Sequence, residues 1–389
     1  MLASFPVGRR LLWPLVAVML AAGLPVVPAA KASADACPAR TSAKPVSPGA
    51  RVSVLTAVAV PRACSVWAVG YFSDGGGSRT LTEHWNGRRW TVLPSPDPGS
   101  GDNVLASLSV VSASSIWAVG DDAAGTRTRT LVLHWNGRRW ARVASPSPGT
   151  LAVLTAVHAV SARDVWAVGL TGFTSSGGVK ALIEHWNGRS WRRVAAPSPG
   201  PPGSDTELRA VTGLSRTSVW AGGFSATAEG VASTLIERWN GRRWRRIASP
   251  GQLPVNRVTG IGAVSAGWAW AAGGTASTSA GRTLVLRWNG RRWTRISAPS
   301  PGLVSSLAGL AAVSRQSAWA VGDVTTKSGT AGLVLRWNGR RWIRAAVAGT
   351  ARSGTLLNGV GAASATDMWA VGSVPGPGGT TRALTIHCC

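Results

Sequence analysis

Acidic side chains, lysine and tyrosine are scarce in this sequence of 389 residues. It contains fifteen aspartates and glutamates, four lysines and one tyrosine, so arginine supplies nearly all of the positive charge. A catalytic site that needs two tyrosines is excluded, and few carboxylates are present to form an acid–base pair. The formal net charge of +26 at pH 7 favours polyanionic partners.

Charged residues of all kinds make up only 14% of the chain, whereas 48 glycines and 23 prolines occur. Low charge together with abundant turn-forming residues is untypical of a helical protein. Hydrophobic residues account for 45%, which is enough for a substantial core. The composition therefore predicts many short β-strands joined by turns.

Long apolar stretches are confined to the N-terminus. Arg9 and Arg10 precede an apolar run over residues 11–27, and Ala32-Ser33-Ala34 has the small-residue pattern of a cleavage site. We therefore expect a secretory signal peptide over residues 1–34.

Other readings of this N-terminus are less favoured. Cleavage after Ala36 is an alternative, and Cys37 invites lipidation although the residues before it form a poor lipobox. Two prolines inside the apolar run disfavour a permanent membrane helix. Residues 35–389 are expected to form a single secreted, extracellular domain, released or associated with the cell wall by binding.

Two short strings recur through the rest of the chain. The string W-A-V-G, or a close variant, recurs at intervals of 49–54 residues, and W-N-G-R-[RS]-W lies between its copies. Together they contain 19 of the 21 tryptophans, so nearly every indole belongs to a structural repeat. The first string begins at Trp67, Trp117, Trp166, Trp220, Trp270, Trp319 and Trp369.

Each repeat is predicted to form four short antiparallel strands, as the second copy illustrates. Apolar and β-branched residues mark strands over 104–111, 115–120, 130–135 and 138–144. Asn136-Gly137 predicts a two-residue type I′ hairpin, because that turn requires positive φ at both central positions. Four strands every ~50 residues are typical of a propeller blade. The expected fold is an all-β, seven-bladed β-propeller with repeats beginning near residues 51, 101, 151, 205, 255, 304 and 354.

The W-A-V-G string also predicts how neighbouring blades pack. Side chains alternate across a strand, so tryptophan and valine face one side while alanine and glycine face the other. The bulky side of one blade can then seat on the small side of the next. We assign these tryptophans to blade packing in preference to stacking on a ligand.

The two chain ends are predicted to meet in the seventh blade. The last repeat stops after its third strand, and Val46-Ser47-Pro48-Gly49 matches the segment that follows the fourth strand elsewhere. We expect the N-terminal stretch to supply the missing outer strand. Repeat register brings Cys37 close to Cys388 and Cys389, where a disulfide would close the ring. Cys64 is the remaining candidate partner, and free thiols at frayed ends are the alternative.

The repeat resembles those of secreted bacterial β-propellers that pair a W-A-V-G strand with a W-x-G-x-x-W hairpin, over residues 37–389. It is more distantly similar to kelch, galactose-oxidase and sialidase-type propellers. The resemblance implies the fold and no particular activity. Galactose oxidase needs two tyrosines at its copper, whereas Tyr71 stands alone here. Asn-Gly-Arg-Arg-Trp replaces the D-G-G-x-x-W turn of sialidase-type repeats, and no catalytic set carries over.

Histidines and carboxylates are dispersed over different repeats. Four histidines share one repeat position, which later repeats fill with arginine, and such a position indicates a solvated cationic site rather than a metal ligand. Single glutamates occur on third strands, and loop aspartates near a ring mouth are the closest approach to a carboxylate pair. The histidines are His84, His134, His185 and His387, the third-strand glutamates are Glu83, Glu184 and Glu237, and the loop aspartates are Asp121, Asp122 and Asp323. We expect no enzymatic activity, no metal and no cofactor.

The arginine pattern is the strongest indication of function. Arginines follow each Asn-Gly dipeptide, and since these hairpins all join third to fourth strands, they are predicted to form a cationic rim on one face. Without Arg9, Arg10 and Lys31 of the signal peptide the net charge is still +23, from 26 − 3. The rim residues are Arg88, Arg89, Arg138, Arg139, Arg189, Arg242, Arg243, Arg291, Arg292, Arg340 and Arg341.

This rim is predicted to bind an anionic cell-wall polymer or polysaccharide, with its arginines stacked on nearby tryptophans. The alternative is that arginine and tryptophan merely cover the rim. A second hypothesis places a glycan or protein partner on the variable second-to-third-strand loops of the opposite face, as in a lectin. A third is an unrecognised hydrolase or lyase with a central site. We expect a monomer.

Overall fold

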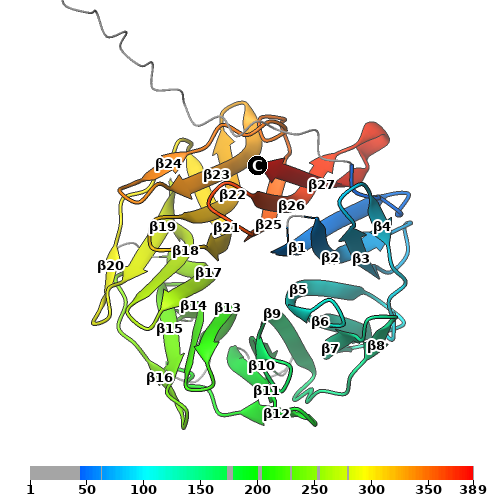
Figure 1. Cartoon of the computed structure of the whole chain (residues 1–389), viewed down its shortest axis with the longest axis horizontal. Helices are drawn as coiled ribbons and strands as arrows, with labels where there is room; N and C mark the ends of the chain where they lie inside the picture. The colour runs from blue at the N-terminus through cyan, green and yellow to red at the C-terminus, as the bar shows by residue number, and fades with distance from the viewer. Residues whose placement is uncertain are drawn as a thin grey trace, which may run out of the picture. The chain divides into compact units, whose positions relative to one another are not determined.

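The structure is a computed structural model that describes residues 44–62, 64–172, 178–199, 204–227, 230–251, 255–277 and 280–388. Within them lie 27 β-strands and one short 3-10 turn, η1 (Pro377–Gly379). No helix in these ranges has the length and apolar character needed to cross a membrane. The strands surround a common axis, with the first strand of each repeat innermost and the fourth outermost (Figure 1).

The strands form seven consecutive groups, which we call blades 1 to 7. Blade 1 contains β1 (Val52–Arg62), β2 (Ser65–Ser73), β3 (Arg79–Trp85) and β4 (Trp90–Val92). Blade 2 contains β5 (Asn103–Ser112), β6 (Ser115–Ala124), β7 (Arg127–Trp135) and β8 (Trp140–Arg142), and blade 3 contains β9 (Leu151–Ser161), β10 (Asp164–Gly172), β11 (Val179–Trp186) and β12 (Trp191–Val194). Blade 4 contains β13 (Asp205–Ser215), β14 (Ser218–Ala226), β15 (Ala232–Trp239) and β16 (Trp244–Arg246), and blade 5 contains β17 (Val255–Ser265), β18 (Trp268–Ala276), β19 (Gly281–Trp288) and β20 (Trp293–Arg295). Blade 6 contains β21 (Val304–Ala312), β22 (Ala318–Thr326), β23 (Gly329–Trp337) and β24 (Trp342–Arg344), and blade 7 contains β25 (Leu356–Ala362), β26 (Met368–Pro375) and β27 (Thr381–Cys388).

Within a blade, neighbouring strands pair antiparallel, as Trp67 of β2 does with His84 of β3. At four junctions between blades, a single parallel pair joins the neighbours, such as Val52 of β1 with Thr381 of β27. The expected all-β propeller is therefore confirmed. The strands predicted for the second repeat correspond to β5–β8, but β8 begins at Trp140 instead of residue 138, and β6 and β7 extend further into the loop between them.

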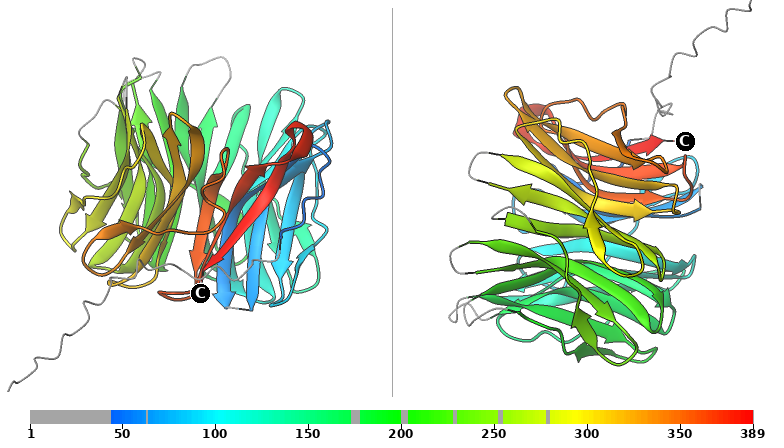
Figure 2. Two further views of the ribbon diagram at one scale, coloured as in Figure 1. Left: turned by 90° about the horizontal axis from the view of Figure 1, so that it is seen from above. Right: turned by 90° about the vertical axis from the view of Figure 1, so that its left-hand side faces the viewer.

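The chain turns define two faces of the ring (Figure 2). The hairpin face carries the turns from first to second strand and from third to fourth strand. The loop face carries the loops from second to third strand and the connections between blades. Each strand therefore has one end at each face. Whether a residue lies near the hairpin face or the loop face depends on its position along its strand.

Neighbouring blades pack as the W-A-V-G string predicts. Trp220 of blade 4 is fully buried in one cluster with Ala269 and Ala271 of blade 5. Its ring centroid lies 5.1 Å from that of Trp288 and 5.4 Å from that of Trp293. The same group of three tryptophans recurs where blades 1, 2, 3, 5 and 7 meet their successors. These tryptophans thus lie in blade-to-blade contacts.

The glycine that ends each W-A-V-G string lies against the backbone of the first strand. A Cβ added to Gly273 would lie 1.9 Å from the carbonyl oxygen of Arg257. The first strand bulges at this level, as the register shift between Val258 and Gly260 shows. A side chain at this glycine must therefore displace backbone.

Gly273→Ala is expected to lower the free energy of unfolding by about 3 kcal/mol or more, because no flexible side chain can move aside. Gly274→Ala is the matched control, since the atom nearest to its added Cβ would be the Ser306 Cβ, at an ordinary contact distance of 3.4 Å. That variant should change stability by less than about 1 kcal/mol. Urea unfolding measures both, and equal loss in the two variants would contradict this role of the glycine.

The N-terminal segment lies where ring closure requires it. The Ala383 N–H of β27 donates to the Ser47 hydroxyl at 3.2 Å, and the equivalent Thr130 N–H of blade 2 donates to Ser147 at 3.2 Å. Residues 46–49 therefore occupy in blade 7 the place of the segment after a fourth strand. The proposed outer strand itself, near Cys37, lies outside the described residues.

The cysteines are only partly described. Cys388 ends β27 and is fully buried. Its candidate partners Cys37 and Cys389 lie outside the described residues, so the pairing stays a prediction. Cys64 is an exposed free thiol in the turn between β1 and β2, which corrects the expectation that it takes a disulfide partner.

Candidate functional site

Each outer hairpin is a four-residue loop held by an asparagine. Trp135 pairs with Trp140, so residues 136–139 all lie in the loop, and the predicted two-residue type I′ turn is wrong. The Asn136 side-chain oxygen accepts the backbone N–H groups of Arg138 and Arg139, each at 3.0 Å. The same pair of bonds recurs in the other five hairpins. The backbone of each arginine pair is therefore held in one repeated conformation.

The eleven hairpin arginines predicted as rim residues are all exposed to solvent. Within the described ranges none of them forms an ion pair with an acidic side chain. Four further exposed arginines lie on the same face, in or next to the turns from first to second strand. The repeat pattern does not reveal them, because only some repeats carry them. They are Arg62, Arg163, Arg216 and Arg315.

Acidic residues are segregated to the opposite face. Of those the structure describes, only Asp164 and Asp367 lie at the hairpin face, and they bind His185 at 2.7 Å and His387 at 3.0 Å. Three others, Glu83, Glu184 and Glu237, are buried singly between blades. The remaining eight lie in the loop-face half of the molecule: Asp74, Asp97, Asp102, Asp121, Asp122, Asp205, Glu207 and Asp323. The hairpin face thus carries an uncompensated positive charge.

The repeat position shared by histidine and arginine packs on tryptophan of its own blade. The His84 ring centroid lies 4.4 Å from that of Trp67, and the Arg238 guanidinium lies 4.9 Å from the Trp220 ring. These side chains are half-buried against the indole, so the position is less solvated than we expected, and burial lowers the pKa of His84. Among described residues the arginines that stack on tryptophan are Arg238, Arg287, Arg315 and Arg336, whereas the expected stacking of hairpin arginines does not occur.

The carboxylates considered for a catalytic pair differ in their surroundings. Asp122 is fully buried and binds Arg129 at 2.8 Å and Arg142 at 3.2 Å. Burial, with neighbouring aspartates, raises the pKa of Asp121 to about 6. Asp323 lies three blades away around the ring, on β22 of blade 6. The structure does not bring these three residues together as an acid–base pair.

The loop face is less uniform than the hairpin face. Three of its predicted variable loops include residues outside the described ranges, namely 173–177, 228–229 and 278–279. In blade 2 the connection expected between the predicted strands 115–120 and 130–135 is largely strand, because β6 continues to Ala124 and β7 begins at Arg127. Large apolar side chains are exposed at this face on Val231, Leu303, Val304 and Leu356.

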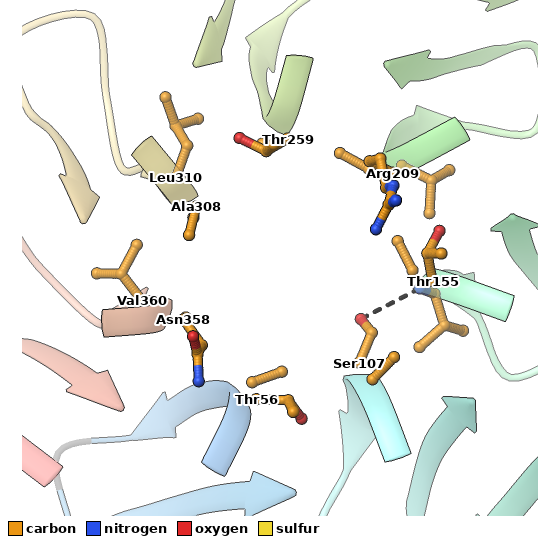
Figure 3. A pocket seen from close by; sticks show the side chains of 18 of the residues that line it. Thr56, Ser107, Thr155, Arg209, Thr259, Ala308, Leu310, Asn358 and Val360 are labelled. Atoms are coloured by element: carbon orange, nitrogen blue, oxygen red, sulfur yellow. Dashed lines mark hydrogen bonds between the residues drawn. The ribbon is translucent and has the colours of Figure 1, made fainter. Parts of the chain in front are cut away.

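A channel cavity of about 210 Å³ lies on the ring axis, lined by three consecutive residues from each first strand. These are residues 56–58, 106–108, 155–157, 209–211, 259–261, 308–310 and 358–360. The first residue of each triplet is the bulged one, and in Thr56, Thr155 and Thr259 its hydroxyl donates to a carbonyl of the next blade at 2.6 Å. Figure 3 shows these side chains around the channel.

The comparisons with known proteins bear on the fold alone. No protein-family model and no curated protein matches the chain. Similar solved structures include YCF48 bound to a D1 peptide, with 13% identity, a TM-score of 0.54, and 89% of this chain and 98% of that chain covered. Another is the GH74 xyloglucanase from Xanthomonas campestris, with 16% identity, a TM-score of 0.54 and coverage of 88% and 55%. A third is a PL25 ulvan lyase bound to -[GlcA(1-4)Rha3S]-, with 10% identity, a TM-score of 0.53 and coverage of 89% and 93%.

These neighbours differ in activity, since one is seen with a peptide and two are carbohydrate-active enzymes. A shared fold at such low identity does not transfer an activity. What the chain does must therefore be argued from its own side chains. By architecture it is a β-propeller.

Proposed function

We propose that this protein is a secreted, non-catalytic binding propeller whose hairpin face binds an anionic polymer of the cell envelope. The observation that carries the proposal is the charge segregation between faces. The hairpin face presents fifteen exposed arginines, eleven of them in asparagine-held hairpins, and both acidic residues described there are paired with histidine. A polymer with regularly spaced phosphates or carboxylates can contact several blades at once.

Arginine suits such a ligand better than lysine would. Its planar guanidinium binds a phosphate or carboxylate through two parallel hydrogen bonds, and it keeps its charge at every physiological pH. The asparagine that holds each hairpin fixes the backbone of the arginine pair before binding, which lowers the entropy lost on association. Release of counterions from the polymer then adds a favourable, salt-dependent contribution.

The test is binding of the mature chain to purified poly(glycerol phosphate) teichoic acid on beads, at 50 and 200 mM NaCl. We expect binding at the lower concentration and a loss of affinity of about a hundredfold or more at the higher one, as for proteins that contact several phosphates. Absence of binding at 50 mM, or equal binding to a neutral dextran, would contradict the proposal. Binding only to double-stranded DNA would identify nucleic acid as the ligand instead.

A protein partner at the loop face is the second candidate. Four exposed large apolar side chains lie there, and YCF48, which shares the fold, is seen with a peptide. Exposed apolar groups favour protein contacts over a charged polymer. We do not favour a hydrolase or lyase, because the buried glutamates lie singly in different blade interfaces.

A further inference from the structure

The axial channel departs from the repeat at one residue of blade 4. Where blades 1, 3 and 5 place a threonine at the bulge, blade 4 places Arg209. Arg209 is the single ionisable side chain among the 21 residues that line the cavity. Its side chain is 44% exposed and points into the channel (Figure 3).

Arg209 is held in position by its own strand. Its Nε donates to the Glu207 carboxylate at 2.8 Å, and one Nη forms an ion pair with the same oxygen. Glu207 is not part of the cavity lining, and its side chain is only 16% exposed. One edge of the guanidinium is therefore occupied, and the other edge remains for a ligand.

Two further polar groups of the channel keep hydrogen-bonding capacity. The Ser107 hydroxyl accepts the Val157 N–H at 3.2 Å, which leaves its proton available. Asn358 donates through its amide nitrogen to the Leu55 carbonyl at 2.9 Å, which leaves its side-chain oxygen as an acceptor. The threonine hydroxyls, in contrast, already donate to neighbouring carbonyls.

We propose that the channel is a second binding site, which takes a small carboxylate that also carries hydroxyl groups, as in a uronic acid. The free guanidinium edge matches one planar carboxylate. A dianionic phosphate fits less well, because Glu207 adds a negative charge beside the arginine. Ser107 and Asn358 supply one donor and one acceptor for ligand hydroxyls. A cavity of about 210 Å³ equals the volume of roughly seven waters, which suits a single small ring.

The test is calorimetric titration of the mature chain with D-glucuronate, glucose and inorganic phosphate. We expect glucuronate to bind more tightly than either of the others, and Arg209→Gln to weaken its binding roughly tenfold or more. Arg282→Gln, an exposed loop-face arginine outside the channel, should leave the affinity unchanged. Two results would overturn the proposal. One is an affinity for glucose equal to that for glucuronate, and the other is an equal affinity of the Arg209→Gln and native chains for glucuronate.

This site is separate from the hairpin face. A variant with Arg138, Arg139, Arg242 and Arg243 changed to glutamine should therefore keep its glucuronate affinity. If that variant loses glucuronate binding while Arg209→Gln keeps it, the carboxylate binds at the hairpins and the channel proposal fails. Loss of teichoic-acid binding alone would bear only on the hairpin face.

Discussion

Changing Glu184 and Glu237 together to leucine is expected to stabilise the protein by several kcal/mol at pH 8. Both carboxyl groups are fully buried between blades and have no hydrogen-bond partner in the part of the chain described. Burial raises the pKa of each to about 8, although Arg193 and Arg246 act in the opposite direction. Blades 2, 5 and 6 carry leucine at the same repeat position, at Leu133, Leu286 and Leu335.

The repeat explains why these two carboxyl groups have no donor. Glu83, their counterpart in blade 1, accepts the Val46 N–H at 3.2 Å. In the segments that precede blades 3 and 4, the equivalent residues are Pro146 and Pro197, and proline has no N–H. Leucine at these positions thus removes an unsatisfied buried acid and leaves no donor without a partner.

The sign of the pH dependence follows from linkage. Because the folded-state pKa is raised, each glutamic acid keeps a proton in the folded protein that the unfolded chain releases above pH 4.5. Stability is therefore fully present below pH 4.5 and falls by about 1.4 kcal/mol per pH unit for each such group, until the pH passes about 8. The lowered pKa of His84 and His134 acts in the opposite direction, chiefly below pH 6.5.

Urea unfolding at pH 6.5, 7.25 and 8 tests this expectation. The native chain should lose stability across the series, and the double leucine variant should lose it much less steeply. Glu184→Gln with Glu237→Gln is the control, since it flattens the dependence but leaves two buried amides in place of the acids. An unchanged slope in both variants would show that these groups are ionised in the folded protein.

Trp220→Ala is expected to lower the free energy of unfolding by about 3–5 kcal/mol, since it leaves a cavity at the centre of the interface between blades 4 and 5. The indole is fully buried and contacts Trp288 and Trp293 of the next blade as well as Arg238 of its own. The surrounding sheets are tied by backbone ladders and cannot collapse into the space, so the cavity persists.

Trp268→Ala is the matched control, because it removes a tryptophan from the margin of a blade interface instead of from its centre. Trp268 lies outside the repeat at the start of β18, is partly exposed, and contacts Arg287, Arg315 and the ring of Trp270. In the same urea titration, Trp268→Ala should lower the free energy of unfolding by less than half as much as Trp220→Ala does. Equal losses of stability would mean that a tryptophan at the centre of a blade interface contributes no more than one at its margin.

The sequence was sufficient to predict the blades but insufficient to predict the details that place the site. Tryptophan spacing, strand alternation and the Ser-Pro-Gly register are local patterns, and they predicted the interfaces and the position of Ser47 correctly. The Asn-Gly signal was misread because Asn136 binds the N–H groups two and three residues ahead and so opens the turn to four residues. The need for glycine at the end of W-A-V-G arises from a bulge in the neighbouring first strand, which no local sequence pattern reveals.

The sequence predicts only part of the charge distribution. The hairpin arginines follow a repeat and were found, whereas Arg209 occurs once and is significant only because seven first strands converge on one axis. The segregation of acids from the hairpin face likewise depends on which strand end each residue occupies. Topology, which brings distant repeats to one face, supplies that information.

Two charge-matched variants test the central claim most directly. One changes six hairpin arginines to glutamine, at Arg138, Arg139, Arg242, Arg243, Arg291 and Arg292, and the other changes six exposed loop-face arginines, at Arg51, Arg79, Arg127, Arg282, Arg352 and Arg382. Both lower the net charge by six. In teichoic-acid binding at 50 mM NaCl, we expect the hairpin variant to lose about a hundredfold in affinity and the loop-face variant less than threefold. Equal losses would mean that net charge alone drives binding, and the hairpin face would then have no specific role.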